Sequence, residues 1–196
     1  MNLSEMIVLV RLELKDTAAP QRWTDDELEG HVFHAVTEFS EALPDEQKQI
    51  VATNPGSREI PLSNVRGLMM VKDVEFPIGQ TPRRLQPFSY WAYTLTLTGE
   101  DTPDGTDACV YCGFLHTLDE TTSTIPGHYE NLIAAGAAGY AAVQMAVFCI
   151  NRVNLGGTTT PADYLNWGRE RVESFRIKLS RLRRKHNFKI RRLHLQ

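Results

Sequence analysis

The spacing of hydrophobic residues predicts helices at both ends of the chain and strands between them. Apolar residues recur every three or four positions in residues 3–16 and from Leu28 to Leu43, which indicates two amphipathic helices. Between residues 46 and 125 the period falls to two, as in β-strands, and helical spacing then returns for 126–185. The pattern therefore predicts an α+β protein in which a β insert separates two pairs of helices.

The segment Trp23–Leu28 is the clearest local signal in the chain. Thr24 and Glu27 have the spacing of a capping box, two aspartates between them favour a helix start, and Trp23 occupies the position of a hydrophobic staple. The second helix is therefore expected to begin directly after Thr24. The first helix is expected to be capped by Ser4.

The central segment contains five short runs with strand-like alternation, separated by turns rich in proline and glycine. The expected strands are 47–53, 58–62, 67–76, 92–98 and 108–118. A Pro-Asp-Gly turn at 103–105 lies between the last two, and it predicts that they pair as a hairpin. Five short strands in this length indicate a small antiparallel barrel or sandwich.

The third helix, expected over 126–153, is apolar on nearly all sides in its second half and should therefore be central. Residues 132–150 carry no charge, which raises the question of a membrane span. This stretch is dominated by alanine and glycine, with Gly136 and Gly139 placed as packing glycines, so close helix packing is favoured and no membrane partner is expected. Gly156–Gly157 are expected to end the helix.

The last helix is expected to start at Thr160–Pro161, with a cap followed by a proline in its first turn. Apolar and small residues then alternate at spacings of three and four, which predicts a seam for partner helices. The seam comprises Leu165, Gly168, Val172, Phe175, Leu179 and Leu182. Lys185–Asn187 are expected to end this helix. The predicted organisation is a four-helix bundle formed by 1–45 and 126–185, a β domain at 46–125, and an extended basic arm at 186–196.

Charge is distributed unevenly along the chain. No acidic residue follows Glu173, whereas the last 21 residues carry nine of the 21 lysines and arginines, so they hold about +9 against about −12 for the rest. Such an arm usually meets an acidic surface or nucleic acid. Apolar residues interleave with these charges, which indicates a docking arm. The residues expected to bind a partner are Arg181, Arg183, Arg184, Lys185, Phe188, Lys189, Ile190, Arg191, Arg192 and Leu193.

Metal and catalytic alternatives find little support in the sequence. Cys109 and Cys112, with His116 and His128, have the number of ligands for zinc, but residues i and i+3 of a strand point to opposite faces. The chain has three cysteines, an odd and sparse set that favours a reducing compartment over a disulfide framework. We therefore expect no cofactor, no bound metal and no enzymatic activity.

A second candidate for chemistry is the pair His31 and His34, which lie three residues apart on the second helix with Glu27 and Glu38 nearby. Such a face could support a metal-dependent hydrolase, although more often it is a solvated helix face. Thr24, Glu27 and the aspartates between them are already explained by helix capping.

Several stretches together resemble the head–tail adaptor, or connector, proteins of tailed bacteriophages, over nearly the whole chain. They are Arg22–Leu28, Phe76–Gln80, His116–Leu118, Gly136–Ala142 and Ile150–Asn154. The resemblance implies a structural virion protein that forms a ring, commonly of twelve copies, beneath the portal at the capsid vertex. It also implies that the C-terminal segment docks onto the portal and that another face receives the next neck or tail component, with non-specific contact to DNA in the channel.

The residues also leave open a nucleic-acid-binding regulator whose basic arm contacts phosphates. That alternative lacks a recognisable module for reading DNA sequence elsewhere in the chain. The predicted location under the first interpretation is the capsid vertex or neck of the virion, after synthesis in the host cytoplasm.

Overall fold

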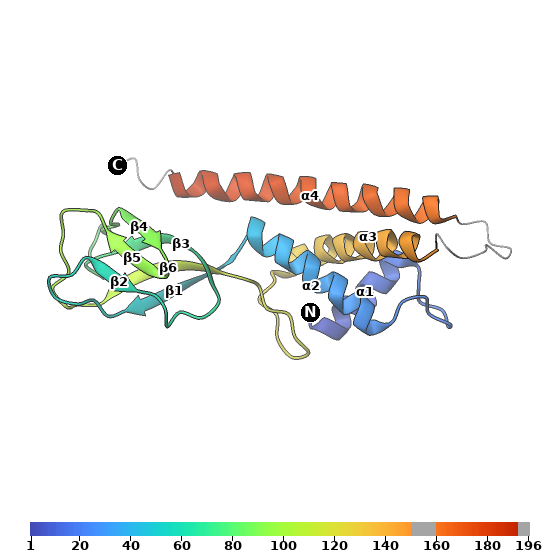
Figure 1. The fold of residues 1–196 in the computed structure, drawn as a ribbon, viewed down its shortest axis with the longest axis horizontal. Coiled ribbons are helices and arrows are strands. Elements are labelled where there is room, and N and C mark those ends of the chain that lie inside the picture. Colours follow the sequence, from blue (N-terminus) through green and yellow to red (C-terminus); the bar gives the residue numbers. More distant parts are fainter. Residues whose placement is uncertain (150–159, 192–196) are drawn as a thin grey trace. The chain divides into compact units, whose positions relative to one another are not determined.

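The computed structural model describes residues 1–149 and 160–191, with side chains up to His186. It is an α+β structure that divides into two compact units (Figure 1). The helical unit contains residues 1–43 and those from His116 onward, and the β unit is Pro44–Leu115. Residues 116–125, which the sequence pattern placed in the β insert, belong to the helical unit, where Leu118 and Ile125 are buried.

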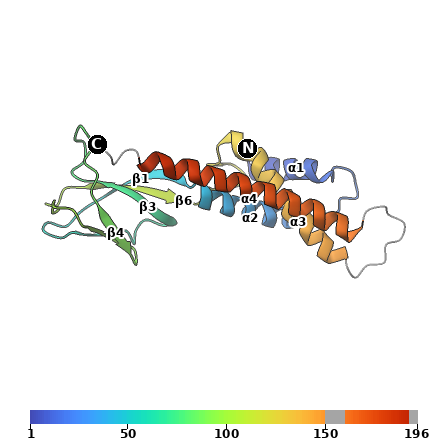
Figure 2. The same ribbon diagram turned by 90° about the horizontal axis from the view of Figure 1, so that it is seen from above.

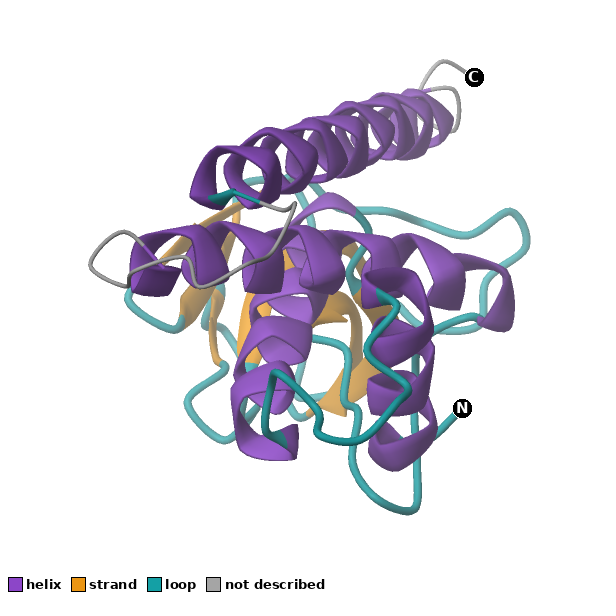
Figure 3. Ribbon diagram, turned by 90° about the vertical axis from the view of Figure 1, so that its right-hand side faces the viewer, coloured by secondary structure: helices purple, strands orange, loops and turns teal. Residues whose placement is uncertain are grey.

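Four α-helices form the described part of the helical unit. They are α1 (Leu3–Leu14), α2 (Asp25–Ala42), α3 (Glu130–Cys149) and α4 (Pro161–Arg191), with a 3₁₀ turn at Gly127–Tyr129 leading into α3. α3 lies between α4 on one side and α1 with α2 on the other (Figures 1 and 3). The apolar pattern of α3 predicted this central position, because a helix that is contacted on several sides is apolar on nearly all of them. Its buried residues include Ile133, Ala137 and Ala141.

The start of α2 confirms the predicted capping box. The Thr24 hydroxyl accepts from the Glu27 amide, and the Glu27 carboxylate accepts from the Thr24 amide at 2.8 Å. Trp23 is buried, and its indole nitrogen donates to the Ala141 carbonyl of α3 at 3.3 Å. The prediction for α1 was wrong by two residues, because Asn2 rather than Ser4 forms the cap, in a capping box with Glu5.

A buried ion pair fixes the connection between α1 and α2. Arg11 donates to the Asp16 carboxylate at 2.8 Å, to the Trp23 carbonyl at 3.0 Å and to the Asp25 carboxylate at 2.6 Å. Asp16 in turn accepts from the backbone amide of Arg22 at 2.9 Å. Because the buried charges of Arg11 and Asp16 both have partners, they hold the loop that presents Trp23 to the core.

Glycines allow α3 and α4 to approach closely where the two helices cross (Figure 2). A Cβ atom added to Gly168 would lie 2.8 Å from the carbonyl oxygen of Gly139, and one added to Gly136 would lie 2.9 Å from the Phe175 ring. The structure confirms that Gly136 and Gly139 are packing glycines. It also confirms part of the predicted seam on α4, since Gly168, Phe175 and Leu179 are buried.

The β unit consists of two three-stranded antiparallel sheets, so of the two predicted forms, barrel or sandwich, a closed barrel is not formed. The strands are β1 (Asp45–Val51), β2 (Glu59–Pro61), β3 (Leu68–Glu75), β4 (Phe88–Trp91), β5 (Thr94–Leu97) and β6 (Ala108–Phe114). Their orders are β1-β6-β3 and β2-β5-β4. Both sheets contribute to one core, in which Ile60, Val74, Leu95 and Val110 are buried.

The prediction that strands 92–98 and 108–118 pair as a hairpin was wrong. β5 instead pairs with β4 across a two-residue turn, in which Ala92 and Tyr93 both have positive φ. β6 pairs with β1 and β3. β6 is buried on both faces, and such a strand belongs in the centre of its sheet, where it needs two partners rather than one.

The C-terminal region also differs from the prediction. The last helix does not end at Lys185–Asn187 but continues to Arg191, so residues 186–191 are helical rather than an extended arm. Arginine and lysine are good helix formers, no glycine or proline interrupts the segment, and cations near a helix C-terminus interact favourably with its dipole. The predicted Gly156–Gly157 helix end lies outside the described residues.

Candidate partner-binding surface on helix α4

Helix α4 packs against the helical core only as far as Leu182 among its described side chains. Phe175 and Leu179 are buried in the helical core, and Leu182 is the last described α4 residue that packs against it. Leu182 lies beside Tyr129 and Leu132, at the beginning of α3. The helix then continues for nine more residues, a rise of about 13 Å at about 1.5 Å per residue. This terminal part of α4 therefore runs past the start of the helix that supports the rest of it.

Basic side chains occupy the exposed surface of this part of α4. Arg181, Arg183, Arg184 and Lys185, all predicted partner-binding residues, are exposed. Phe188, Lys189, Ile190 and Arg191 lie on the backbone of α4, but their side chains are outside the described part of the structure. Arg192 and Leu193 lie beyond the described residues altogether. The predicted partner-binding residues whose side chains are described therefore all lie on α4 and are all positively charged.

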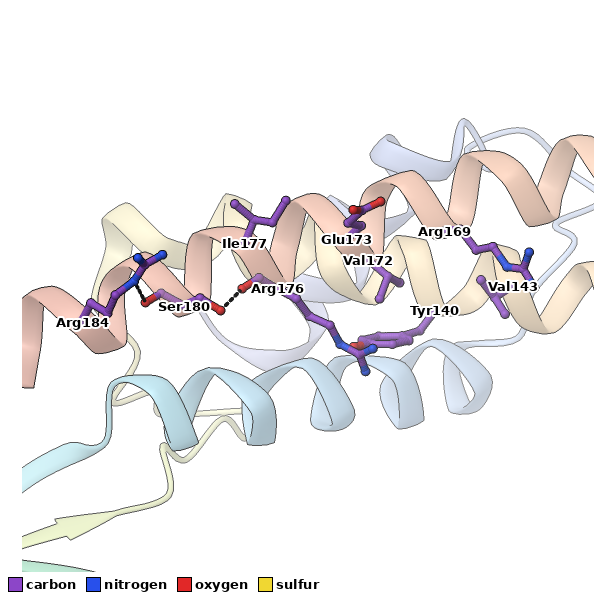
Figure 4. A pocket seen from close by; sticks show the side chains of 9 residues that line it. All are labelled: Tyr140, Val143, Arg169, Val172, Glu173, Arg176, Ile177, Ser180 and Arg184. Carbon is purple, nitrogen blue, oxygen red and sulfur yellow. Dashed lines mark hydrogen bonds between the residues drawn. The ribbon is translucent and has the colours of Figure 1, made fainter.

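A groove of about 710 Å³ runs beside α4, on the side where Tyr140 of α3 lies (Figure 4). Its apolar lining includes Val143, Val172 and Ile177, and Ile177 is 45% exposed. The remaining lining residues are Tyr140, Arg169, Glu173, Arg176, Ser180 and Arg184. Sequence reasoning missed this groove, because it treated α4 upstream of residue 181 only as a packing seam.

Two residues that line this groove, Tyr140 and Arg176, are both hydrogen-bonded to Glu38 of α2. The Glu38 carboxylate accepts from Arg176 of α4 at 2.7 Å, from the Tyr140 hydroxyl of α3 at 2.7 Å, and lies 3.3 Å from the His34 ring. The hydrogen bond from Arg176 is the main cause of a lowered pKa at Glu38. Burial and the nearby Glu38 charge raise the pKa of Tyr140. These contacts join three helices and neutralise Arg176.

A second groove, of about 570 Å³, lies on another side of α4. Lys178 and Arg181 of α4 line it. Glu13 of α1 lines it too, as do Tyr129 and Leu132 from the start of the α3 region. α4 therefore has a hollow along each of two sides, and both hollows have basic residues from α4 in their walls.

The histidines of α2 serve to join helices. His31 is hydrogen-bonded to Gln144 of α3, and burial lowers its pKa. The His34 ring packs edge-on against Tyr140, at 4.4 Å between ring centroids. Among residues 1–149 and 160–191, no group of three or more His, Cys, Asp or Glu side chains could hold a metal ion. The structure therefore brings His31 and His34 to the α2–α3 contact rather than to a metal-binding cluster.

The cysteines of β6 are buried in the β unit. Burial raises the pKa of Cys109 and raises that of Cys112 to about 11. Thiols with raised pKa values are mostly protonated near neutral pH, so they are poor nucleophiles and poor metal ligands.

One described helical segment, Gly127–Cys149, is long and apolar enough to cross a membrane by length and composition. Half of the most apolar 18-residue window of this segment is buried. Its apolar character is thus used at least in part to pack against α1, α2 and α4.

The chain was also compared with known proteins. No known protein family matches it, and no characterised protein matches it significantly in sequence. The function must therefore be argued from the surface of α4.

Proposed function

We propose that this protein is a structural head–tail adaptor of a tailed bacteriophage, which forms a ring under the portal and joins the DNA-filled capsid to the neck and tail. The resemblance of the sequence to connector proteins motivates the proposal. The observation that carries it is that α4 continues past Leu182 as a helix whose side chains at 183–185 are basic, exposed and outside the hydrophobic core.

A helix that extends beyond its own core suits attachment to a second protein. Alternating apolar and basic residues at 188–193 would give such a partner both a hydrophobic contact and a charge contact. An acidic surface on the portal would complement Arg183, Arg184 and Lys185 and would speed encounter at low salt. The portal and the neck proteins are the partners in this proposal, with no catalytic step and no cofactor.

The exposed cations also favour a second candidate, a regulator that binds nucleic acid through α4. Five described cations that follow Ile177 on α4, at positions 178, 181, 183, 184 and 185, are exposed and could neutralise phosphates. Binding of this kind weakens steeply with salt and does not require a portal. Gel shifts at two salt concentrations distinguish the two candidates, because only the regulator binds naked DNA tightly at low salt.

Deletion of residues 185–196 tests the proposed adaptor function. The truncated chain keeps Leu182 and all described core residues, so we expect a folded subunit whose circular dichroism spectrum loses only the helical signal of residues 185–191. We also expect that it no longer joins portal-bearing capsids, measured by co-sedimentation with purified capsids. A control for loss of positive charge replaces Lys48 and Arg58 of the β unit by glutamine, which removes two cations elsewhere and should leave joining intact. Normal joining by the truncated chain would refute the proposal.

A further inference from the structure

The outer surface of α2 carries an exposed stripe that no other described element covers. Asp26, Gly30, Phe33, Thr37 and Glu41 follow one another at spacings of four, three, four and four, which places them on one side of the helix. All five are exposed, and the Phe33 side chain is 40% exposed at the centre of the stripe. The stripe thus has a carboxylate at each end and an aromatic ring in the middle.

The groove beside α4 has the complementary arrangement. Arg169, Glu173, Ile177, Ser180 and Arg184 line it in sequence, and all five are exposed (Figure 4). Read from the C-terminal end, their spacings are also four, three, four and four. A guanidinium group therefore marks each end, and the apolar Ile177 occupies the middle.

We propose that the α2 stripe of one copy of this chain docks in the α4 groove of a second copy, with the two helices antiparallel. In that register the pairs are Asp26 with Arg184, Gly30 with Ser180, Phe33 with Ile177, Thr37 with Glu173, and Glu41 with Arg169. Both ends unite opposite charges, and the centre buries two side chains that the isolated chain leaves in water. In a parallel arrangement Phe33 would meet Arg176 instead, so the apolar alignment selects the antiparallel one.

Three further observations support a second copy as the occupant. Within the described part of the chain, Asp26, Glu41, Arg169 and Arg184 form no ion pair, so their charges are available to a neighbour. A Cβ atom added to Gly30 would have no described heavy atom within 4 Å, which leaves room for close approach of a helix. The inner side of α2, with His31 and Glu38, already contacts α3 and α4 of its own chain.

The stripe and the groove are different surfaces of one molecule, so the contact is heterologous. Repetition of a heterologous contact produces a ring if the rotation closes and an open filament if it does not. One helix stripe buries less than the roughly 800 Å² per partner of a standard interface, so association should be weak and dependent on concentration and salt. The inference adds to the proposed adaptor function a specific contact between neighbouring copies, but it requires no portal.

Sedimentation velocity of the full-length protein over a concentration series, at low and high salt, tests this contact. We expect the wild type to show an increase of sedimentation coefficient with concentration that high salt reduces. The variants Asp26→Lys/Glu41→Lys and Arg169→Glu/Arg184→Glu should each lose this increase, and an equimolar mixture of the two should regain it. The matched control Arg181→Glu/Lys185→Glu changes the same charge away from the groove and should retain it. Circular dichroism verifies that each variant is folded.

Disulfide trapping provides a second measurement that does not depend on charge. In a background with Cys149→Ser, a mixture of Phe33→Cys and Ile177→Cys chains should form mixed disulfide dimers faster than a mixture of Phe33→Cys and Lys178→Cys chains. Lys178 lines the groove on the other side of α4 and serves as the control. Equal trapping in the two mixtures, a wild type that stays monomeric throughout, or no recovery on mixing the charge variants would each overturn the proposal. Both experiments measure contact between copies of this chain without a capsid or a portal, whereas the adaptor function is judged by joining to portal-bearing capsids, so the two can fail separately.

Discussion

The two parts of helix α4 have opposite relations to the rest of the molecule. Residues 161–182 pack against α3 through Gly168, Phe175 and Leu179, whereas residues 183–191 extend beyond the last described core contact. In the first part the α3 and α4 backbones lie so close that only certain residue sizes fit at each position. In the second part the side chains at 183–185 are exposed, so charge and helix propensity matter more than size.

One continuous helix is therefore a core element over part of its length and an exposed, basic surface at 183–185. The packed part should respond strongly to changes in side-chain volume and weakly to changes in charge. The protruding part should do the reverse. The following predictions test that contrast, beginning with the largest expected change in the free energy of unfolding.

Phe175→Ala should lower the free energy of unfolding by about 3–5 kcal/mol, because removal of the buried ring leaves a cavity against the glycine face of α3. Arg183→Ala, eight positions further along the same helix, should change it by no more than about 0.5 kcal/mol. Urea unfolding followed by circular dichroism measures both. A similar loss for the two variants would remove the contrast between the two parts of α4.

Gly168→Ala should lower the free energy of unfolding by about 1–3 kcal/mol, although alanine is the better helix former. The added methyl carbon would approach the Gly139 carbonyl to 2.8 Å, so the two backbones would have to separate. The matched control is Gly30→Ala on α2, where no described heavy atom lies within 4 Å of the new methyl group. There the same substitution should stabilise the protein by about 0.5–1 kcal/mol. The prediction fails if both substitutions have the same sign in thermal or urea unfolding.

Glu38→Gln should lower the free energy of unfolding at neutral pH by about 1 kcal/mol or less, because the ion pair with Arg176 is partly exposed. The pKa of Glu38 is lowered in the folded protein from its ordinary value of 4.5. The contribution of Glu38 is therefore complete above pH 4.5 and is lost as the pH falls through the lower pKa of the folded state.

Unfolding of wild type and variant as a function of pH measures this effect, and the difference between them should shrink on acidification. Glu41→Gln, an exposed carboxylate on the same helix, is the control and should show little difference at any pH. A difference that grows at low pH would contradict the direction of the Glu38 pKa shift.

Much of the helical unit could be predicted because its signals are local. Thr24 and Glu27 form a capping box from backbone and side-chain groups three residues apart, so the start of α2 follows from the sequence. The packing role of Gly136 and Gly139 follows from their place in an alanine-rich stretch. The exposure of Arg181, Arg183, Arg184 and Lys185 follows equally from their charge.

The β unit was predicted less well because strand pairing is not local. A turn at Pro103–Gly105 looks like a hairpin turn, yet the strands on either side of it belong to different sheets. The strand Phe88–Trp91 was missed because it is short and its turn contains Ala92 and Tyr93, not the glycine or asparagine that usually adopts positive φ. The groove beside α4 was also missed, since it depends on how α3 and α4 cross.

The sequence by itself determined the α+β class, the capping of α2, the central place of α3 and the concentration of positive charge at the C-terminus. Those properties depend on periodicity, on contacts within one turn of helix and on composition. Only the tertiary structure decided which strands pair, which atoms the α4 glycine approaches, and which residues of α4 line the groove beside it. The physical reason is that these features depend on distances between segments far apart in the chain, which local periodicity does not specify.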